Sequence, residues 1–406
     1  MKSLLPLKLT VLCVLFFIST SHGDVITIAK KGKGQIKLHF KVESTPSKFS
    51  ILLKEALKKS GYFKIGKTGA YEVSLKEIES GAHQLKISEH GQVIPKGYFQ
   101  QKITGVKDTQ KSLIVADTII EKILGKGKAF LRSRIAFSAI GADGHKEIYS
   151  IDPLGKQLKK ITNYKTITVE PEWSPNNKLM NYVVYAGNQV KFVQREMSSG
   201  KHRVLTRFNG LNSSAAFSPD GKYLAMTLSK DKQIDLYYLS ANNTKKGGRL
   251  TTNGDVEASP VWSPDSRSIL YVSSRIYKNG KIGRPLLHIL NTKTKKTKRL
   301  FTDGIERVSP SWSSKTGKIA YAKKMGGKYV IAVCNPNDPA QSEEVILKLA
   351  GYWEAPSWAP NGRHLVCTRE INGRRELYII DSISKQKRKI SLDLKKCSLP
   401  DWSSLR

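Results

Sequence analysis

Four glutamates recur a few residues before an aromatic side chain, and they are the first candidates for chemistry in this chain. They are Glu170, Glu257, Glu306 and Glu354. Converging carboxylates could bind a cation or a basic partner, whereas the alternative is that each one caps backbone groups or pairs with a lysine. Both interpretations stay open at this point. We expect no cofactor and no resident metal.

The sequence carries no convincing catalytic signature. It has no G-x-S-x-G and no H-E-x-x-H, and its histidines show no ligand spacing. Gly61, Gly66, Lys67 and Thr68 match a phosphate-binding loop formally, but a helical pattern precedes Gly61 where that loop needs a strand. We therefore predict a non-enzymatic protein without catalytic residues. The alternative is a hydrolase or peptidase-like protein, because similar repeats accompany the catalytic domain of some peptidases.

A repeat of 44 to 50 residues organises most of the chain. Each repeat has an aromatic residue on a short strand, a turn such as Ser218–Gly221, and a β-branched strand. This period is typical of a β-propeller, in which each repeat supplies one four-stranded blade. The aromatic residues should pack blade against blade. They are Trp173, Phe217, Trp262, Trp312, Trp358 and Trp402.

The two ends of the repeat array complement each other. Three strand-like segments after Arg132 have no aromatic residue before them, and Trp402 has no strands after it. If the strand at 399–403 joins those three segments, the array makes six blades closed by the C-terminal strand. We predict this six-bladed propeller for residues 131–406, with no exposed sheet edge left by the closure.

Residues 24–130 have the pattern of a small α/β domain. One predicted helix is capped by Thr45, has Pro46 in its first turn and ends at Gly61. A second begins near Asp108 and ends at Gly125. Strand-like segments lie between the helices.

Residues 1–23 read as a secretory signal peptide, with lysines before an apolar core that is too short to span a bilayer. The expected product is a soluble, exported protein without a transmembrane segment. Three cysteines remain after cleavage, Cys334, Cys367 and Cys397, and they permit at most one disulfide.

The formal charge of +36 is unusual. Lysine-rich runs fall mainly at predicted blade edges, where a solvated rim is the simpler interpretation. The functional alternative is a polyanion-binding envelope protein, attracted to anionic envelope lipids or to lipopolysaccharide phosphates. Nucleic acid is disfavoured, because the protein is exported and no aromatic residues alternate with the basic runs. The runs are 58–59, 245–246, 293–299, 323–324 and 385–389.

The chain resembles the TolB family of the Tol-Pal envelope system. The resemblance covers the whole mature chain and rests on the opening segment, the helix ending LKKSGYFKI, the joint at 119–137 and the WSPD-type repeats. It implies a periplasmic adaptor that supports outer-membrane integrity and envelope constriction during division. It also implies that a TolA-type inner-membrane protein binds the N-terminal segment, Asp24, Val25, Ile26, Thr27 and Ile28.

The resemblance further implies that a Pal-type lipoprotein binds one face of the propeller. Loops that lead into the innermost strands of a propeller gather at one mouth of its channel, where loop variation carries function. Tyr352 and Trp353 are the best aromatic candidates there, since interface cores favour such residues. The predicted set for this mouth is Glu170, Asn209, Glu257, Glu306, Tyr352, Trp353 and Glu354.

Overall fold

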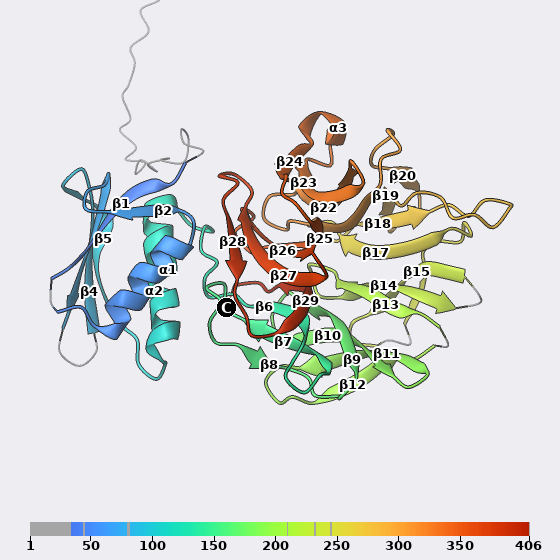
Figure 1. Ribbon diagram of the computed structural model, residues 1–406, viewed down its shortest axis with the longest axis horizontal. Coiled ribbons are helices and arrows are strands. Elements are labelled where there is room, and N and C mark those ends of the chain that lie inside the picture. The colour runs from blue at the N-terminus through green and yellow to red at the C-terminus, as the bar shows by residue number, and fades with distance from the viewer. Residues whose placement is uncertain are drawn as a thin grey trace, which may run out of the picture. The chain divides into compact units, whose positions relative to one another are not determined.

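The computed structural model describes residues 34–43, 45–78, 82–208, 210–230, 233–243 and 246–405 (Figure 1). Residues from Lys33 onward form one compact unit. The predicted signal peptide and the segment Asp24 to Ile28 lie outside the described residues. None of the helices in the described part is both long enough and apolar enough to cross a membrane.

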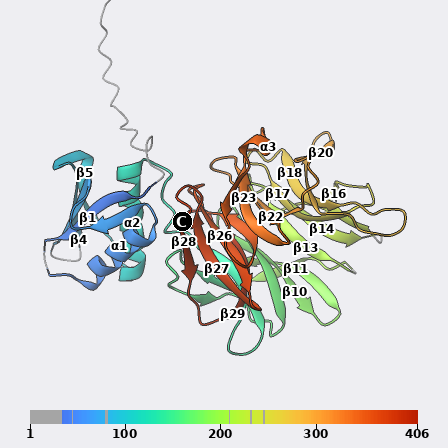
Figure 2. The same cartoon turned by 45° about the horizontal axis from the view of Figure 1, so that its top comes forward.

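An α/β domain occupies the first part of the described chain. Its sheet has the order β2-β1-β3-β4-β5, in which β1 runs parallel to β2 and β3 while the remaining pairs are antiparallel. Two helices lie on one face of this sheet (Figures 1 and 2). The elements are β1 (Ile36–Val42), α1 (Lys48–Lys59), β2 (Phe63–Gly66), β3 (Tyr71–Glu77), β4 (Ala82–Glu89), β5 (Gln92–Lys102) and α2 (Asp108–Leu124).

The helices follow the apolar pattern of the sequence, with one correction. α1 buries Leu53, Ala56 and Leu57, as a 3.6-residue period requires. The predicted cap at Thr45 is wrong, because the helix begins at Lys48 and the Ser47 hydroxyl accepts the backbone N–H of Ser50 at 3.2 Å. Serine satisfies one of the free N–H groups of the first turn there.

The rest of the chain forms the predicted six-bladed propeller (Figures 1 and 2). Four blades are separate four-stranded sheets, and the first two are joined by one bridge, Lys146 to Ile167. The first blade combines β29 (Lys395–Trp402) with β6 (Ile135–Ile140), β7 (Lys146–Ile151) and β8 (Lys159–Lys160), and the second has β9 (Ile167–Trp173), β10 (Leu179–Ala186), β11 (Gln189–Glu196) and β12 (His202–Thr206). The third has β13 (Asn212–Phe217), β14 (Tyr223–Lys230), β15 (Gln233–Ser240) and β16 (Gly247–Arg249), and the fourth has β17 (Val256–Trp262), β18 (Ser268–Ser274), β19 (Leu286–Asn291) and β20 (Thr297–Arg299). The fifth has β21 (Arg307–Trp312), β22 (Ile319–Met325), β23 (Lys328–Cys334) and β24 (Glu344–Leu347), with the single turn α3 (Pro339–Ser342) before β24, and the sixth has β25 (Tyr352–Trp358), β26 (His364–Ile371), β27 (Arg374–Asp381) and β28 (Lys387–Ile390).

The C-terminal strand closes the ring, as predicted. β29 pairs antiparallel with β6 and places Trp402 opposite Ile135. The closure is reinforced beyond the strand pairing, because the Trp402 indole N–H donates to the Ser133 hydroxyl at 2.6 Å and the Arg134 N–H donates to Ser403 Oγ at 2.8 Å. The first blade therefore depends on residues more than 250 positions apart in the sequence.

The aromatic anchors belong to the propeller core. Five of the six are less than 9 % exposed, and Trp312 is partly buried. Trp262 and Trp358 also donate their indole N–H groups to carbonyl oxygens of the preceding blade, those of Ala216 and Ser311. Each such contact satisfies a buried donor while fixing the position of one blade against the next.

The three described cysteines are buried and form no disulfide. Burial raises the pKa of Cys334 to about 12 and that of Cys397 to about 11. Because the thiolate is the reactive form, these side chains act as small apolar groups of the core.

A buried carboxylate ties α2 to the segment that leads into the first strand of the propeller, β6. Asp117 accepts the backbone N–H groups of Phe130, Leu131 and Arg132 at 2.9 to 3.0 Å. On the other side of this joint, Tyr62 receives a hydrogen bond from the Asn361 amide at 3.0 Å. The segment 119–137, which carries the family resemblance, is held by Asp117 of the α/β domain and by Trp402 of the propeller, whose indole N–H donates to Ser133.

Candidate functional site

The six innermost strands share a kink that shapes the channel. At the kink, one residue has φ between 49° and 55°, and the strand pairing shifts its register there. Proline follows the kink in five blades and alanine in one. A positive φ costs energy in a residue other than glycine, so the repetition indicates a shared structural requirement. The kinked residues are Glu170, Ser214, Ser259, Ser309, Ala355 and Leu399.

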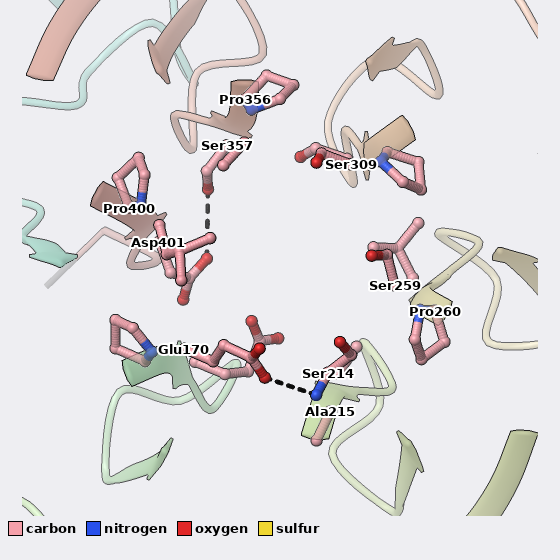
Figure 3. Close-up of a pocket in the computed structure, with 18 residues that line it drawn as sticks. Glu170, Ser214, Ala215, Ser259, Pro260, Ser309, Pro356, Ser357, Pro400 and Asp401 are labelled. Atoms are coloured by element: carbon pink, nitrogen blue, oxygen red, sulfur yellow. Dashed lines mark hydrogen bonds between the residues drawn. The ribbon is translucent and has the colours of Figure 1, made fainter. Parts of the chain in front are cut away.

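These kinks surround a cavity of about 210 Å³ on the axis of the propeller (Figure 3). Each innermost strand contributes its kinked residue and the two residues that follow. The lining is formed mostly by small side chains and prolines, and its acidic members are Glu170, Glu172 and Asp401. The channel is therefore narrow and carries its charge on one side, where β9 and β29 meet.

On several innermost strands, the residue just before the aromatic anchor accepts a hydrogen bond from the backbone N–H of the anchor in the next blade. Asp401 accepts the N–H of Trp173 at 2.7 Å, and Ser357 Oγ accepts the N–H of Trp402 at 2.9 Å. Glu172 makes a longer contact of the same kind to the N–H of Phe217, at 3.4 Å. The bond between Asp401 and Trp173 completes this series across the point of closure.

Glu172 and Asp401 form a pair of carboxyl groups that lie close to each other in this confined space. Burial raises the pKa of Asp401, and burial together with the negative charge of Asp401 raises the pKa of Glu172. The pair therefore holds a proton more tightly than two separate carboxyl groups would. The sequence analysis did not identify either residue. The available signal was an acidic residue between proline and tryptophan, where other blades have alanine, valine or serine.

The four predicted glutamates do not meet at one point. Glu170 accepts hydrogen bonds from the Ser213 hydroxyl and the Ser214 N–H, both at 2.7 Å (Figure 3 shows the latter). Glu306 pairs with Lys324 at 2.7 Å, and this contact lowers its pKa. Glu354 lies 3.8 Å from Arg375, and Glu257 is fully buried. No group of three His, Cys, Asp or Glu side chains suited to a metal occurs within the described ranges.

The predicted aromatic pair splits between surface and core. Tyr352 is 48 % exposed, whereas Trp353 is fully buried and donates its indole N–H to the Leu349 carbonyl at 3.2 Å. Of the two, only Tyr352 is therefore accessible at the surface. Asn209 lies outside the described residues.

Exposed apolar side chains gather at the ends of the blades where the innermost strands begin. Strand pairing places Ile167 opposite Tyr185 and Tyr352 opposite Glu370 at these ends. We call this end of the propeller the mouth face. Single exposed apolar groups are normal on a protein surface, but several of them at one end of the blades mark a candidate docking surface. Its large exposed apolar side chains are Ile167, Tyr185, Phe208, Ile276, Tyr277, Ile282, Met325 and Tyr352.

A basic hollow of about 650 Å³ opens beside Ile167 on the mouth face. Lys146, Arg375 and Lys396 line it, and Glu370 is its only acidic lining residue. Partial burial and repulsion from Arg375 and Lys396 lower the pKa of Lys146. Arg375 pairs with Glu370 at 2.6 Å and lies 3.8 Å from Glu354, so the three cations face two carboxylates. One positive charge remains that an acidic group could neutralise.

The buried carboxyl group of Glu257 makes the stability of the protein depend on pH. Burial raises its pKa to about 7, although Ser273 donates a hydrogen bond at 3.4 Å. Because the folded pKa lies above the unfolded value, stability is greatest below the unfolded pKa and falls as pH rises toward 7. We expect Glu257→Gln to raise the free energy of unfolding at pH 8 by up to about 3 kcal/mol and to change it little at pH 4.5.

The measurement is urea unfolding of both proteins at the two pH values. Glu306→Gln is the matched control, because its carboxylate is partly exposed and paired with Lys324. An equal effect of Glu257→Gln at both pH values would show that the folded protein does not hold this carboxyl group in its protonated form.

Sequence comparison relates the chain to one family. The model of the TolB beta propeller domain matches residues 120–406. The chain is 30 % identical over 183 residues to "Protein TolB homolog" of Chlorobium chlorochromatii and 29 % identical over 175 residues to "Tol-Pal system protein TolB" of Desulfotalea psychrophila. These alignments cover 44 % and 42 % of this chain but only 40 % and 38 % of the two curated relatives.

Structural comparison extends the likeness in fold to both domains. The structure resembles that of TolB from Acinetobacter baumannii with a TM-score of 0.79 and 19 % sequence identity. This similarity covers 91 % of the present chain and 97 % of the other. At this level of identity, it demonstrates a shared fold.

Proposed function

Because the chain belongs to the TolB family, we propose that it is a non-enzymatic periplasmic adaptor of the Tol-Pal system. In this proposal the mouth face binds a Pal-type lipoprotein, and the segment Asp24 to Ile28 binds a TolA-type inner-membrane protein. The linkage would support outer-membrane integrity and envelope constriction during division. The exposed apolar side chains Ile167, Tyr185 and Tyr352 of the mouth face are the observation that carries the proposal.

The surface chemistry of the mouth face supports a docking role. Tyr352 supplies an exposed aromatic group on a rigid strand, and such residues often dominate binding energy. Glu354 pairs with Arg375 nearby, and Arg375 also lines the basic hollow. A partner that covers Tyr352 and presents an acidic group to the hollow would thus gain both apolar burial and charge complementarity.

Two changes should separate the two partners. A chain lacking residues 24–33 is expected to lose the TolA-type partner and to retain the Pal-type lipoprotein in pull-downs from envelope extract. Tyr352→Ala should do the reverse and weaken binding of the purified lipoprotein by about tenfold or more. Affinity can be measured by calorimetry with the lipoprotein domain from the same genome.

Tyr98→Ala is the matched control, since Tyr98 is 58 % exposed but lies on β5 of the α/β domain. It should leave the affinity for the lipoprotein unchanged. Undiminished lipoprotein binding by Tyr352→Ala, or loss of both partners on removal of residues 24–33, would contradict the assignment of these two surfaces.

A further inference from the structure

One blade carries a much longer hairpin than its neighbours. Residues 275–285 connect β18 to β19, whereas only two residues separate the second and third strands of four other blades. We call residues 275–285 the basic arm. It is the gold loop that extends beyond β18 and β19 in Figure 1, and it projects from the propeller again in Figure 2.

Backbone hydrogen bonds make the basic arm a fixed structure. Ile276 and Ile282 face each other in a β-bridge, and the Tyr277 N–H donates to the Lys281 carbonyl at 2.9 Å. The base of the arm is anchored to the next blade, where the Arg307 N–H donates to the Pro285 carbonyl at 3.2 Å. The backbone of the arm is therefore ordered, and this sets the positions from which its side chains project.

The tip of the basic arm combines exposed apolar groups with cations. Ile276, Tyr277 and Ile282 are 43 %, 49 % and 59 % exposed. Four cations accompany them, and residues 275–285 include no acidic residue. These cations are Arg275, Lys278, Lys281 and Arg284.

The adjacent blade repeats the pattern on a smaller scale. Met325 is 40 % exposed at the end of β22, and Lys328 begins β23 three positions beyond it. Register places both hairpins at the mouth face, because Val256 pairs with Ser274 and Arg307 pairs with Lys323. The apolar and basic surface thus extends over two neighbouring blades.

We propose that the basic arm binds the surface of an anionic phospholipid bilayer. Arginine and lysine would contact lipid phosphates while Ile276, Tyr277 and Ile282 enter the boundary between headgroups and acyl chains. A protein partner fits less well, since the cores of protein interfaces are depleted of lysine, whereas lysine and arginine around aliphatic and aromatic groups are typical of interfacial segments. This inference does not depend on the adaptor role.

The first experiment measures sedimentation of the full chain with vesicles of phosphatidylcholine that contain roughly a third phosphatidylglycerol. The arm variant combines Arg275→Gln, Lys278→Gln, Lys281→Gln and Arg284→Gln, and we expect it to lower the partition coefficient by about thirtyfold or more. Vesicles of phosphatidylcholine alone should bind neither protein strongly.

A control with the same change of net charge exists in the same blade. Lys293, Lys295, Lys296 and Lys298 are all exposed but lie in or beside the connection from β19 to β20, at the opposite end of the strands. Their joint replacement by glutamine should reduce vesicle binding by less than about threefold. If this control and the arm variant lost binding equally, the attraction would come from net charge, and the proposal would fail.

The second experiment tests insertion at the tip. Tyr277→Trp provides an exposed indole, and brominated phosphatidylglycerol vesicles should quench its fluorescence, while the native tryptophans remain largely shielded. Ile276→Asn with Ile282→Asn should weaken vesicle binding although no charge changes. If the arm variant does not fold, Lys278→Glu with Lys281→Glu replaces it, since both lysines are exposed.

Three results would overturn the proposal. These are no binding to the anionic vesicles, no quenching of the introduced indole in the Tyr277→Trp protein, and arm-dependent binding of a hexaglutamate peptide without binding of vesicles. The last result would assign the basic arm to an acidic protein partner.

Discussion

A chain that ends at Lys395 is expected to be unfolded, or to melt at least about 15 °C below the full-length protein. The missing residues include nearly all of β29, which supplies one strand of the first blade. Trp402 is 6 % exposed, and removal of a buried tryptophan side chain alone costs about 3 to 5 kcal/mol. The loss would also expose the edge of β6 and remove the bond from Trp173 to Asp401.

Circular dichroism on heating is a suitable measurement for this truncation. A chain that ends at Ser404 is the matched control, because it keeps β29, the bond from Trp402 to Ser133 and the bond from Arg134 to Ser403. It should melt close to the full-length protein. If the chain ending at Lys395 had the same midpoint as this control, closure by β29 would contribute nothing to the stability of the propeller.

The blade count could be predicted because each blade has to bury the same kind of side chain at the same place. The aromatic anchors gave six positions, and the unmatched strands at the two ends of the array gave the closure through Trp402. The predicted start of α1 was wrong by two residues. Ser47 and Thr45 are both able to cap, and only the course of the chain after β1 decides that Ser47 does so.

The candidate site was harder to predict, because the spacing of charged residues does not show which way they face. Glu170 lies three residues before its anchor and Glu257 five, and the first accepts hydrogen bonds beside the channel while the second is fully buried. The acidic pair Glu172 and Asp401 arises between the second blade and the closing strand. Residues so distant in sequence become neighbours only when the ring closes.

The basic arm can be detected in the sequence as one repeat that is longer than the others. The interval from Trp262 to Trp312 is 50 residues, whereas the other intervals are 44 to 46 residues. The excess identifies an insertion, and the structure places it between β18 and β19. A deviation from the repeat length is thus a better indicator of a special surface here than lysine runs such as 293–299, which occupy an ordinary connection between outer strands.

The closed ring of blades provides rigidity, and the hairpins and strand ends at the mouth face provide the exposed surface. The kinked inner strands and the bonds between anchors, such as that from Trp402 to Ser357, fix six blades around a narrow axis. Fixed blades hold Tyr352 and the basic arm in constant positions on the mouth face. A surface that is already ordered loses little conformational entropy when a partner or a membrane binds to it.

The joint between the two domains should be equally sensitive to a single carboxylate. Asp117 is 1 % exposed and accepts three backbone N–H groups, and the Arg132 guanidinium donates to it at 3.2 Å. We expect Asp117→Ala to lower the free energy of unfolding by about 4 kcal/mol, because each buried donor left without a partner costs about 1 to 3 kcal/mol. Asp117→Asn should cost about half as much, because its amide oxygen can still accept hydrogen bonds, whereas its NH₂ group is a donor and cannot accept from the remaining N–H groups.

Urea unfolding can be compared with that of Asp108→Asn, in which the change is made at the partly exposed start of the same helix. Loss of this charge near the helix N-terminus should cost less than about 1 kcal/mol. If Asp117→Ala cost no more than Asp108→Asn, the three hydrogen bonds would not hold the joint. The expected order, alanine worse than asparagine at 117 and both worse than the control, follows from the number of buried N–H groups that each variant leaves unsatisfied.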